Sequence, residues 1–435
     1  MRRTAMFFVV FALFVAMPFA QAPKTFDTYY IDTEGGGGAL FVSPTGQTVL
    51  VDVGNAGTRD PERIMEAVHA AGAKQIDYLV ITHYHGDHIG GFLELSKMIP
   101  IMHYYDHGPT IQPEQNSASK QAYDAAIAKG PHVVPKPGDK LPVTGLDWTF
   151  VSVAGNTLKT DMKGAPGAGK PNPYCADFKQ KDIQADLENG QSTGSVISYG
   201  KFRTVDLGDL LWNMEGDMMC PTNHIGTVDV YLTSHHGLSW SNSKALIHAI
   251  QPRVIIMNNG TRKGGEIEAF DNIWSSPQLE DLWQQHWSFN GVLEYNTAGR
   301  FIANVEDNAT SAGIVANPPA PTVSRLGPPA PRAGGAGGGA RGGGAPGAPG
   351  APAGPGAAPG AGGPGGTAAA AGPGGPAGAP GAPGAGGAGA GRGPGGGGAA
   401  AHSPAYWIKV SAQTDGTFTV TNARNGFSKT YRPRN

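Results

Sequence analysis

Ile76-Asp77-Tyr78-Leu79-Val80-Ile81-Thr82-His83-Tyr84-His85-Gly86-Asp87-His88 is the stretch that decides the fold. Its first six residues are mostly apolar or aromatic, which is typical of a buried strand. The strand leads directly into three histidines and one aspartate within six residues. A polar loop with incidental histidines is the alternative, but four ligand-capable side chains at one strand end favour a metal-binding site.

His83 and His85 are two residues apart in an extended segment, so both side chains face the same side and can converge on one ion. Tyr84, between them, is expected to point away. Imidazole nitrogen together with carboxylate oxygen is a ligand set that suits zinc, and also iron or manganese. We therefore predict a centre with one or two zinc ions, with iron and manganese as alternatives.

Asp87 and His88 follow Gly86, which is expected to let the chain turn and to direct both side chains toward a second ion. A helix expected to begin near Ile89 would place its positive end beside Asp87 and so stabilise the carboxylate. The motif therefore predicts two neighbouring metal positions. The first metal position is next to His83, and the second is next to His88.

A second strand, Phe202–Leu207, ends at Gly208-Asp209. A carboxylate that follows a strand and a glycine is suited to bridge two metal ions, so we predict Asp209 as the bridging ligand. Asp206 is a competing choice. A single aspartate at a strand end is more often structural, and the prediction depends on its combination with the histidine motif.

A third strand, Val228–Thr233, leads into Ser234-His235-His236-Gly237. One of the two histidines is expected to complete the second metal position, and the other is expected to contact substrate. We assign His236 to the metal and His235 to a catalytic role, although the spacing does not distinguish them. All three segments follow buried strands, where active-site residues of layered α/β folds gather.

The globular body is expected to span residues 23–311, with helices between many of its strands, which indicates layers of helices and sheets. One helix is expected from Asp60-Pro61, where the aspartate caps the first turn, and another over Asn242 to Ile250. Trp274, Trp283 and Trp287 fall in a stretch expected to be helical and buried. Further strands are expected at Ala39–Val42, Thr48–Val53, Trp148–Val153, Gly194–Tyr199 and Arg253–Met257.

The two ends of the chain differ from this body in composition. Residues 1–22 combine an arginine pair with a short apolar stretch and an A-x-A-like site, which is typical of a cleaved signal peptide and of export to the periplasm or medium. Residues 312–402 are nearly all Gly, Ala and Pro, so we expect a disordered linker or inserted loop. Residues 403–435 have two alternating runs around Asp415-Gly416. They predict a β hairpin or meander docked on the body.

Charge and cysteine content exclude some classes of function. The formal net charge is −2, without the global basic excess typical of nucleic-acid binders. No second apolar run suggests a membrane span after signal cleavage. Cys175 and Cys220 do not form a C-x-x-C motif, which argues against thiol redox chemistry. In an exported protein we expect them to pair as a disulfide, with two buried free thiols as the alternative.

The motif residues resemble those of the metallo-β-lactamase-fold hydrolases, through an H-x-H-x-D-H signature at His83, His85, Asp87 and His88. The sequence is most similar to the hydrolase domain of the competence proteins (ComEC/Rec2 type) and to phosphorylcholine esterases. The resemblance covers about residues 27–260. It implies an αββα sandwich, with Asp52 behind the ligands, Asp209 as the bridging aspartate, and 235–237 as a His-His-Gly element.

One position departs from the family pattern. Many members carry a further histidine ligand in a turn similar to Gly190–Ser195, where this sequence has Gln191. A glutamine carbonyl is a poorer zinc ligand than imidazole. The departure argues against a β-lactamase or glyoxalase, and it implies that the first metal position is weak, open or completed differently.

These residues together predict an exported metal-dependent hydrolase. The resemblance implies a metal-activated hydroxide as nucleophile, oriented by Asp87, with His235 stabilising charge or protonating the leaving group. The candidates for substrate binding are Gln191, Arg262 and Lys263, although the loop that contains the last two is equally typical of a surface turn. A phosphoester is the favoured substrate. The alternatives are a lactone, amide or carboxyl ester, and a non-catalytic binding module stabilised by metal.

Overall fold

A computed structural model describes residues 24–112, 116–183, 187–304 and 404–434 of the chain. The chain divides into two units, residues 1–330 with 398–435 and residues 331–397. Every described residue belongs to the first unit. The expected signal peptide over 1–22 and the expected low-complexity segment over 312–402 lie outside the described residues.

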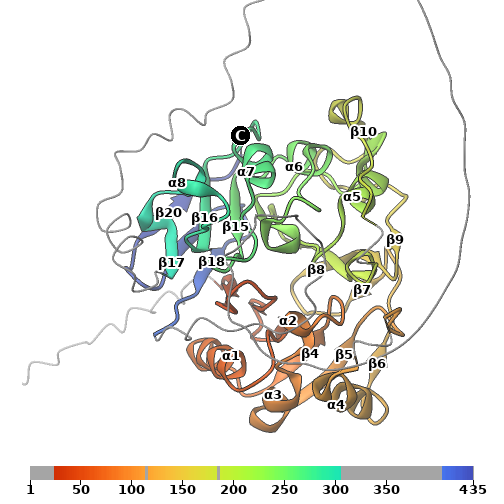
Figure 1. The fold of residues 1–435 in the computed structure, drawn as a ribbon, viewed down its shortest axis with the longest axis vertical. Helices are drawn as coiled ribbons and strands as arrows, with labels where there is room; N and C mark the ends of the chain where they lie inside the picture. The colour runs from red at the N-terminus through yellow and green to blue at the C-terminus, as the bar shows by residue number, and fades with distance from the viewer. Residues whose placement is uncertain (1–23, 113–115, 184–186, 305–403, 435) are drawn as a thin grey trace, which may run out of the picture. The chain divides into compact units, whose positions relative to one another are not determined.

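The first sheet has the strand order β20-β19-β18-β1-β2-β3-β4-β5-β6. It joins the N-terminal strands to the last strands of the chain (Figure 1). Strands β3, β4, β5 and β6 run parallel to one another, and the remaining pairs are antiparallel. Its strands are β1 (Phe26–Tyr30), β2 (Ala39–Val42), β3 (Thr48–Val51), β4 (Ile76–Val80), β5 (Ile101–Tyr105), β6 (His132–Val133), β18 (Ile408–Ala412), β19 (Phe418–Asn422) and β20 (Ser428–Tyr431).

The second sheet has the order β17-β16-β15-β14-β12-β11-β8-β7, and β9 pairs with β8. A separate small sheet joins β10 (Lys170–Pro171) to β13 (Thr222–Asn223). The strands of the second sheet are β7 (Lys140–Leu141), β8 (Asp147–Val153), β9 (Asn156–Thr157), β11 (Gly194–Tyr199), β12 (Phe202–Asp206), β14 (Val230–Leu232), β15 (Val254–Met257), β16 (Asp281–His286) and β17 (Ile302–Asn304).

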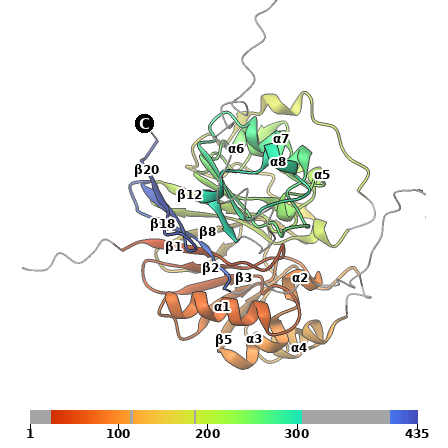
Figure 2. The same cartoon turned by 60° about the vertical axis from the view of Figure 1, so that its left-hand side comes forward.

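Helices cover the outer faces of both sheets (Figure 2). The first sheet carries α1 (Arg59–Ala70), α3 (Phe92–Met98) and α4 (Ala118–Ile127), and the second carries α5 (Trp212–Met219), α6 (Lys244–Ile250) and α7 (Ile267–Trp274). The shorter helices are α2 (Gly86–Ile89), α8 (Val292–Tyr295), and the 3-10 turns η2 (Pro173–Cys175), η3 (Asn189–Gln191), η4 (Ser234–Gly237) and η5 (Gly299–Phe301).

Successive side chains of a strand point to opposite faces of its sheet, and this alternation explains the four layers. Val49 and Val51 of β3 belong to the apolar core between the sheets, whereas Leu50 faces the helices of the first sheet. In the second sheet Phe150 packs between the sheets and Val151 packs under the helices. Three buried cores therefore separate four layers, and the expected αββα sandwich is confirmed.

The C-terminal meander completes the first sheet. Strand β18 pairs antiparallel with β1, and Phe26 lies opposite Ala412. Phe418 of β19 is buried in the core between the sheets. At the start of the segment, Asn304 donates to the Tyr406 carbonyl at 2.9 Å and accepts from the Tyr406 amide at 2.7 Å. The docking expected from sequence is therefore present.

Two further expectations can be compared with the structure. Cys175 and Cys220 are joined by a disulfide of 2.01 Å. Trp283, expected in a helix, lies instead in β16 and is fully buried. The parallel pairing of β16 with β15 outweighs the local pattern. Among the described residues, no helix is both long and apolar enough to cross a membrane.

Candidate metal centre

The loop after β4 presents the first two histidines as the alternation requires. His85 has extended backbone angles, with φ −64° and ψ 149°. His83 Nε2 lies 3.0 Å from His85 Nδ1, so the two rings converge on one point. Tyr84 turns away from them, and its hydroxyl donates to the Gly108 carbonyl at 2.7 Å. These two imidazoles lie at the predicted first metal position.

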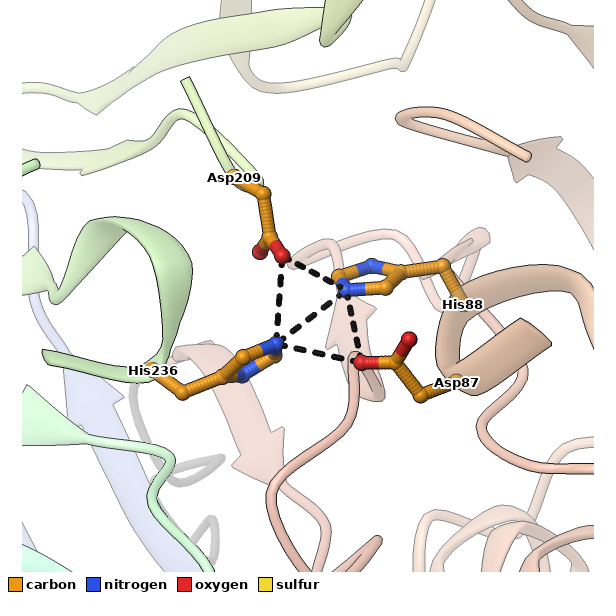
Figure 3. Close-up of side chains that lie close together, drawn as sticks. All are labelled: Asp87, His88, Asp209 and His236. Atoms are coloured by element: carbon orange, nitrogen blue, oxygen red, sulfur yellow. Dashed lines mark hydrogen bonds and ion pairs between the residues drawn. The ribbon is translucent and has the colours of Figure 1, made fainter. Parts of the chain in front are cut away.

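Helix α2 begins at Gly86, earlier than expected, and carries the other two residues of the motif. His88 Nε2 lies 3.4 Å from Asp87 Oδ2 and 3.3 Å from His236 Nε2. Figure 3 shows both residues facing Asp209 and His236. The ligand atoms of all four residues lie within 4.8 Å of one another, so this group could hold a metal ion at the predicted second position.

One carboxylate oxygen lies at the centre of both positions. Asp209 Oδ2 is 3.2 Å from His236 Nε2 and 3.3 Å from His88 Nε2. It is 3.6 Å from His235 Nε2 and 3.8 Å from His83 Nε2. Ligands at zinc-bond distances around one ion are roughly 3.3 Å apart in tetrahedral geometry. Asp209 Oδ1 is buried and has no hydrogen-bond partner among the described residues. These donors fit a metal ion.

The turn after β12 brings Asp209 to this place. Gly208 has φ +56°, and an added Cβ would lie 2.7 Å from Thr82 Cβ. The Asp209 amide donates to Ser192 Oγ at 3.2 Å. Asp206, the competing choice, instead accepts from the Gly208 amide at 3.0 Å. Burial raises the pKa of Asp206 to about 7. Asp206 therefore supports the turn and lies outside the group of ligand atoms.

His235 and His236 both adopt left-handed backbone conformations, with φ of 51° and 56°. A buried network holds their turn, η4, in this shape. Asn242 Nδ2 donates to the carbonyls of Ser234 at 2.9 Å and Leu238 at 3.1 Å. Tyr231 Oη accepts from the Ser234 amide at 2.9 Å. The strain of two left-handed residues is therefore maintained by the surrounding core.

Further polar residues hold the ligand rings from behind. Asp52 Oδ2 lies 2.7 Å from His88 Nδ1, as the resemblance implied. Asp52 also accepts from the amide and the hydroxyl of Thr82, at 2.8 Å each. The Asn258 amide lies 3.1 Å from His236 Nδ1. Such contacts orient a ligand ring and are typical of metal-binding histidines.

Charge in the cluster favours the metal-binding protonation states of several ligands. Burial, followed by His88 and His85, holds the pKa of His83 well below its ordinary value. Burial alone would raise the pKa of Asp209, but His236, His88 and His235 outweigh it and lower the pKa. Burial alone would lower the pKa of His88, but the carboxylates of Asp209 and Asp52 outweigh it and raise the pKa. A bound cation would replace the proton on His88.

Sequence reasoning missed a buried carboxylate that contacts the backbone of the histidine motif. Glu188 Oε1 lies 2.8 Å from His107 Nε2 and accepts from the Tyr84 amide at 3.1 Å. Its Oε2 accepts from the Ile111 amide at 3.2 Å. Glu188 thus fastens the loop after β5 to the histidine motif. His107 is its buried partner. The only sequence signal was the position of Glu188 just before the turn of Gln191.

The three candidates for substrate binding have different contacts in the structure. Lys263 Nζ forms an ion pair with Asp87 Oδ2, so the lysine faces the second metal position. Arg262 places its guanidinium over the ring of Phe289, 4.7 Å from the centroid. Gln191 donates to the Leu187 carbonyl at 3.4 Å and lies beside Gly155. The structure therefore places only Lys263 next to the predicted ligands.

A second group within metal-binding distances consists of Asp32, Glu34 and His286. The guanidinium of Arg63 pairs with Asp32 at 3.0 Å and with Glu34 at 3.2 Å. A cation is thus already supplied by the protein, and it pairs with both carboxylates. This group is a buried ion-pair network between α1 and the second sheet.

Comparison with known proteins agrees with this geometry. Residues 32–157 match the family model described as the metallo-beta-lactamase superfamily. The chain therefore contains a metallo-beta-lactamase superfamily domain. The match covers β2 to β6 of the first sheet and β7 to β9 of the second, and it includes the histidine motif.

Solved structures with a similar fold share little sequence with this chain. The metallo-beta-lactamase fold protein YhfI from Bacillus subtilis is 13% identical, with a TM-score of 0.36, over 60% of this chain and 95% of that chain. CmlA, a diiron beta-hydroxylase from Streptomyces venezuelae, is 14% identical, with a TM-score of 0.31, over 55% and 46%. A metallo-beta-lactamase from Cronobacter sakazakii is 14% identical, with a TM-score of 0.29, over 47% and 76%. None of the curated proteins matches the chain.

Proposed function

We propose that this protein is a metal-dependent hydrolase of phosphoesters. The observation that supports it is the single oxygen Asp209 Oδ2, surrounded by imidazole nitrogens from two separate segments. A zinc ion held by these residues would polarise a scissile bond and lower the pKa of water from 15.7 toward about 7. Asp87 is placed to orient the attacking water, because its Oδ2 faces His88 and His236. Iron or manganese would suit the same donors.

The charge next to the centre supports an anionic substrate. Lys263 is partly exposed, and its ammonium group lies against Asp87 at the edge of the second metal position. When a cation neutralises Asp87, this ammonium becomes available to an anionic oxygen of the substrate. A phosphoester carries such an oxygen, whereas a lactone or a simple ester does not. The phosphoester is therefore the favoured substrate class.

Activity on bis-p-nitrophenyl phosphate tests this proposal. We expect turnover in zinc-loaded protein, and a loss of at least about 10³-fold in Asp209→Asn, because the ligand shared by both positions is weakened. Asp161→Asn is the matched control, since Asp161 pairs with His224 away from the centre. Preferential turnover of a lactone or of nitrocefin would favour the carboxyl-ester or amide alternative. Full metal occupancy without turnover of any of these would indicate a binding module.

Lys263→Ala and Arg262→Ala form a second matched pair. Loss of the Lys263 ammonium should raise KM for the phosphodiester about fivefold, because a partly exposed charge contributes about 1 kcal/mol to binding. Arg262→Ala should leave KM unchanged. Equal effects of the two changes would remove the argument for an anionic substrate.

We also propose that the protein is exported and belongs to the competence-type branch of the superfamily. Export is supported by the composition of residues 1–22 and by the disulfide, which is typical of oxidising compartments. The branch is supported by His235-His236-Gly237 and by Gln191 in place of the turn histidine. Cell fractionation, with N-terminal sequencing of the mature protein, tests export. An uncleaved protein in the cytoplasmic fraction would contradict it.

A further inference from the structure

We propose that Glu188 is the positioning residue of the His83 and His85 side chains, which it holds through the backbone between them and through a neighbouring loop. The proposal rests on the proposed function, in which both histidines belong to the metal centre. Glu188 is fully buried, and its carboxylate accepts hydrogen bonds from two segments that are distant from it in the sequence. Glu188 therefore determines where the two imidazole rings lie.

The histidine motif lies beyond the end of β4, so its backbone amides need acceptors other than a neighbouring strand. Strand β4 ends at Val80. The Thr82 amide donates to Asp52 Oδ1 at 2.8 Å. Two residues later, the Tyr84 amide donates to Glu188 Oε1 at 3.1 Å. Two buried carboxylates thus take the place of a strand partner, and Glu188 holds the peptide group that follows the first histidine of the motif.

The loop after β5 connects Glu188 to the motif a second time. Glu188 Oε2 accepts from the Ile111 amide at 3.2 Å and from the Thr110 hydroxyl at 3.2 Å. The next residue of this loop, Gln112, has its Oε1 3.4 Å from His85 Nε2. The other ring nitrogen of His85, Nδ1, lies 3.0 Å from the first histidine of the motif. Glu188 therefore acts on His85 from two directions, through the backbone before it and through a contact to its ring.

Both oxygens of the Glu188 carboxylate are needed for this arrangement. Oε1 accepts from the Tyr84 amide, Oε2 accepts from the Ile111 amide, and the side chain is 0% exposed. Glutamine has one oxygen and one NH2 group, so in either orientation its NH2 group would face a backbone N–H that has lost its acceptor. A buried donor without a partner costs the desolvation energy of that group. Glu188→Gln, which keeps the shape of the side chain, therefore tests the role.

Asp229 provides a matched control. Its carboxylate is also buried and also accepts from a backbone amide, that of Arg203, at 3.0 Å. Asp229 precedes β14, whereas the histidines of η4 follow this strand, so Asp229 lies at the opposite end of β14 from the metal centre. Asp229→Asn should therefore destabilise the fold without disturbing the centre. Thr110→Val is a milder change beside Glu188, because both backbone amides keep their carboxylate oxygens.

Zinc titration and hydrogen exchange of the full-length protein, freed of metal with a chelator, test the proposal. In Glu188→Gln we expect the affinity for one zinc ion to fall about 10- to 100-fold, as is usual when a residue that orients a metal ligand is lost. The Tyr84 amide should exchange about tenfold faster in the same metal-free variant. Thr110→Val should change both quantities in the same direction by less. Asp229→Asn should lower the midpoint of denaturant unfolding and leave both quantities unchanged.

The proposal is overturned if Glu188→Gln binds zinc as tightly as the wild type, or if its Tyr84 amide exchanges at the wild-type rate. It is also overturned if Asp229→Asn weakens zinc binding equally, because the effect would then be one of general stability. If the glutamine variant does not fold, wild-type affinity and exchange in Thr110→Val contradict the proposal. A wild type that binds zinc but hydrolyses no phosphodiester contradicts the proposed function instead, so the two failures are distinguishable.

Discussion

The two halves of the metal centre are built in different ways. The half on the first sheet takes His83, His85, Asp87 and His88 from six consecutive residues, in extended and helical backbone. The half on the second sheet takes Asp209, His235 and His236 from two distant turns. Gly208, His235 and His236 there have φ of 56°, 51° and 56°. The first half follows from local sequence, whereas the second depends on tertiary structure.

Because of this difference, the backbone strain of the centre lies in the second-sheet half. A non-glycine residue in the left-handed region costs about 1 kcal/mol or more, and it persists only where the surroundings enforce it. Around η4 the surroundings are Asn242, Tyr231 and the buried carboxylate of Glu215. Changes that do not touch a ligand should therefore damage the second-sheet half more than the first-sheet half.

The largest effect is expected for Gly208→Ala compared with Gly86→Ala. A Cβ at Gly208 would collide with Thr82 and displace Asp209, and the left-handed backbone disfavours alanine. We expect hydrolysis to fall about 10³-fold, since a displacement of about 1 Å already costs 10²-fold. A Cβ at Gly86 meets nothing within 4 Å, so that variant should keep its activity. Equal losses in both variants would contradict the comparison.

Removal of the disulfide should give the next largest effect. Cys175 and Cys220 close a loop of 45 residues, and Cys220 ends α5, the helix that carries Glu215. Loop-closure entropy predicts a loss of about 4 kcal/mol in the free energy of unfolding when both are changed to Ser. Denaturant unfolding of the metal-free protein measures it. A loss below about 1 kcal/mol would mean that the bridge does not support this half.

The pH dependence of stability should report on Glu215. Burial raises its pKa from 4.5 to about 7 in the folded protein. Between these pH values the folded state keeps a proton that the unfolded state releases. The contribution of Glu215 to stability therefore falls with rising pH, by about 3 kcal/mol in all, and is constant above pH 7.

Denaturant unfolding of wild type and Glu215→Gln from pH 4.5 to 8 measures this contribution as the difference between their slopes. The variant should lose less stability as pH rises. Glu62→Gln, an exposed change in α1 of the other half, should follow the wild type. A variant curve parallel to that of the wild type would show that Glu215 does not titrate in this range.

The smallest of these effects is expected for Asn242→Ala. The change removes two hydrogen bonds to the carbonyls of Ser234 and Leu238, and it leaves those carbonyls buried. We expect about 2 kcal/mol of lost stability and weaker zinc binding at the second position. Asn156→Ala, whose side chain is exposed, is the control and should change stability by less than about 0.5 kcal/mol. Unchanged zinc affinity would show that η4 keeps its shape without Asn242.

The sequence predicted the first-sheet half of the centre better than the second-sheet half. The alternation of His83 and His85, and their position after a strand, correctly indicated convergent rings. Asp209 could be proposed only because it also follows a strand. Asp206, the competing choice, is distinguished from it by tertiary contacts that local sequence patterns do not reveal. Glu188 was missed, since its partners come from two segments that are distant from it in the sequence. Trp283 was misplaced because strand pairing overrides local periodicity.

The pairing of β1 with β18 has a consequence for the order of synthesis. Phe26 lies opposite Ala412, so nearly the whole polypeptide separates two strands that are neighbours in the sheet. At 5–20 residues per second, a ribosome needs roughly 20 to 80 s to make the intervening chain. During this time one edge of β1 has no partner strand. The first sheet cannot be completed before the last residues of the chain are made.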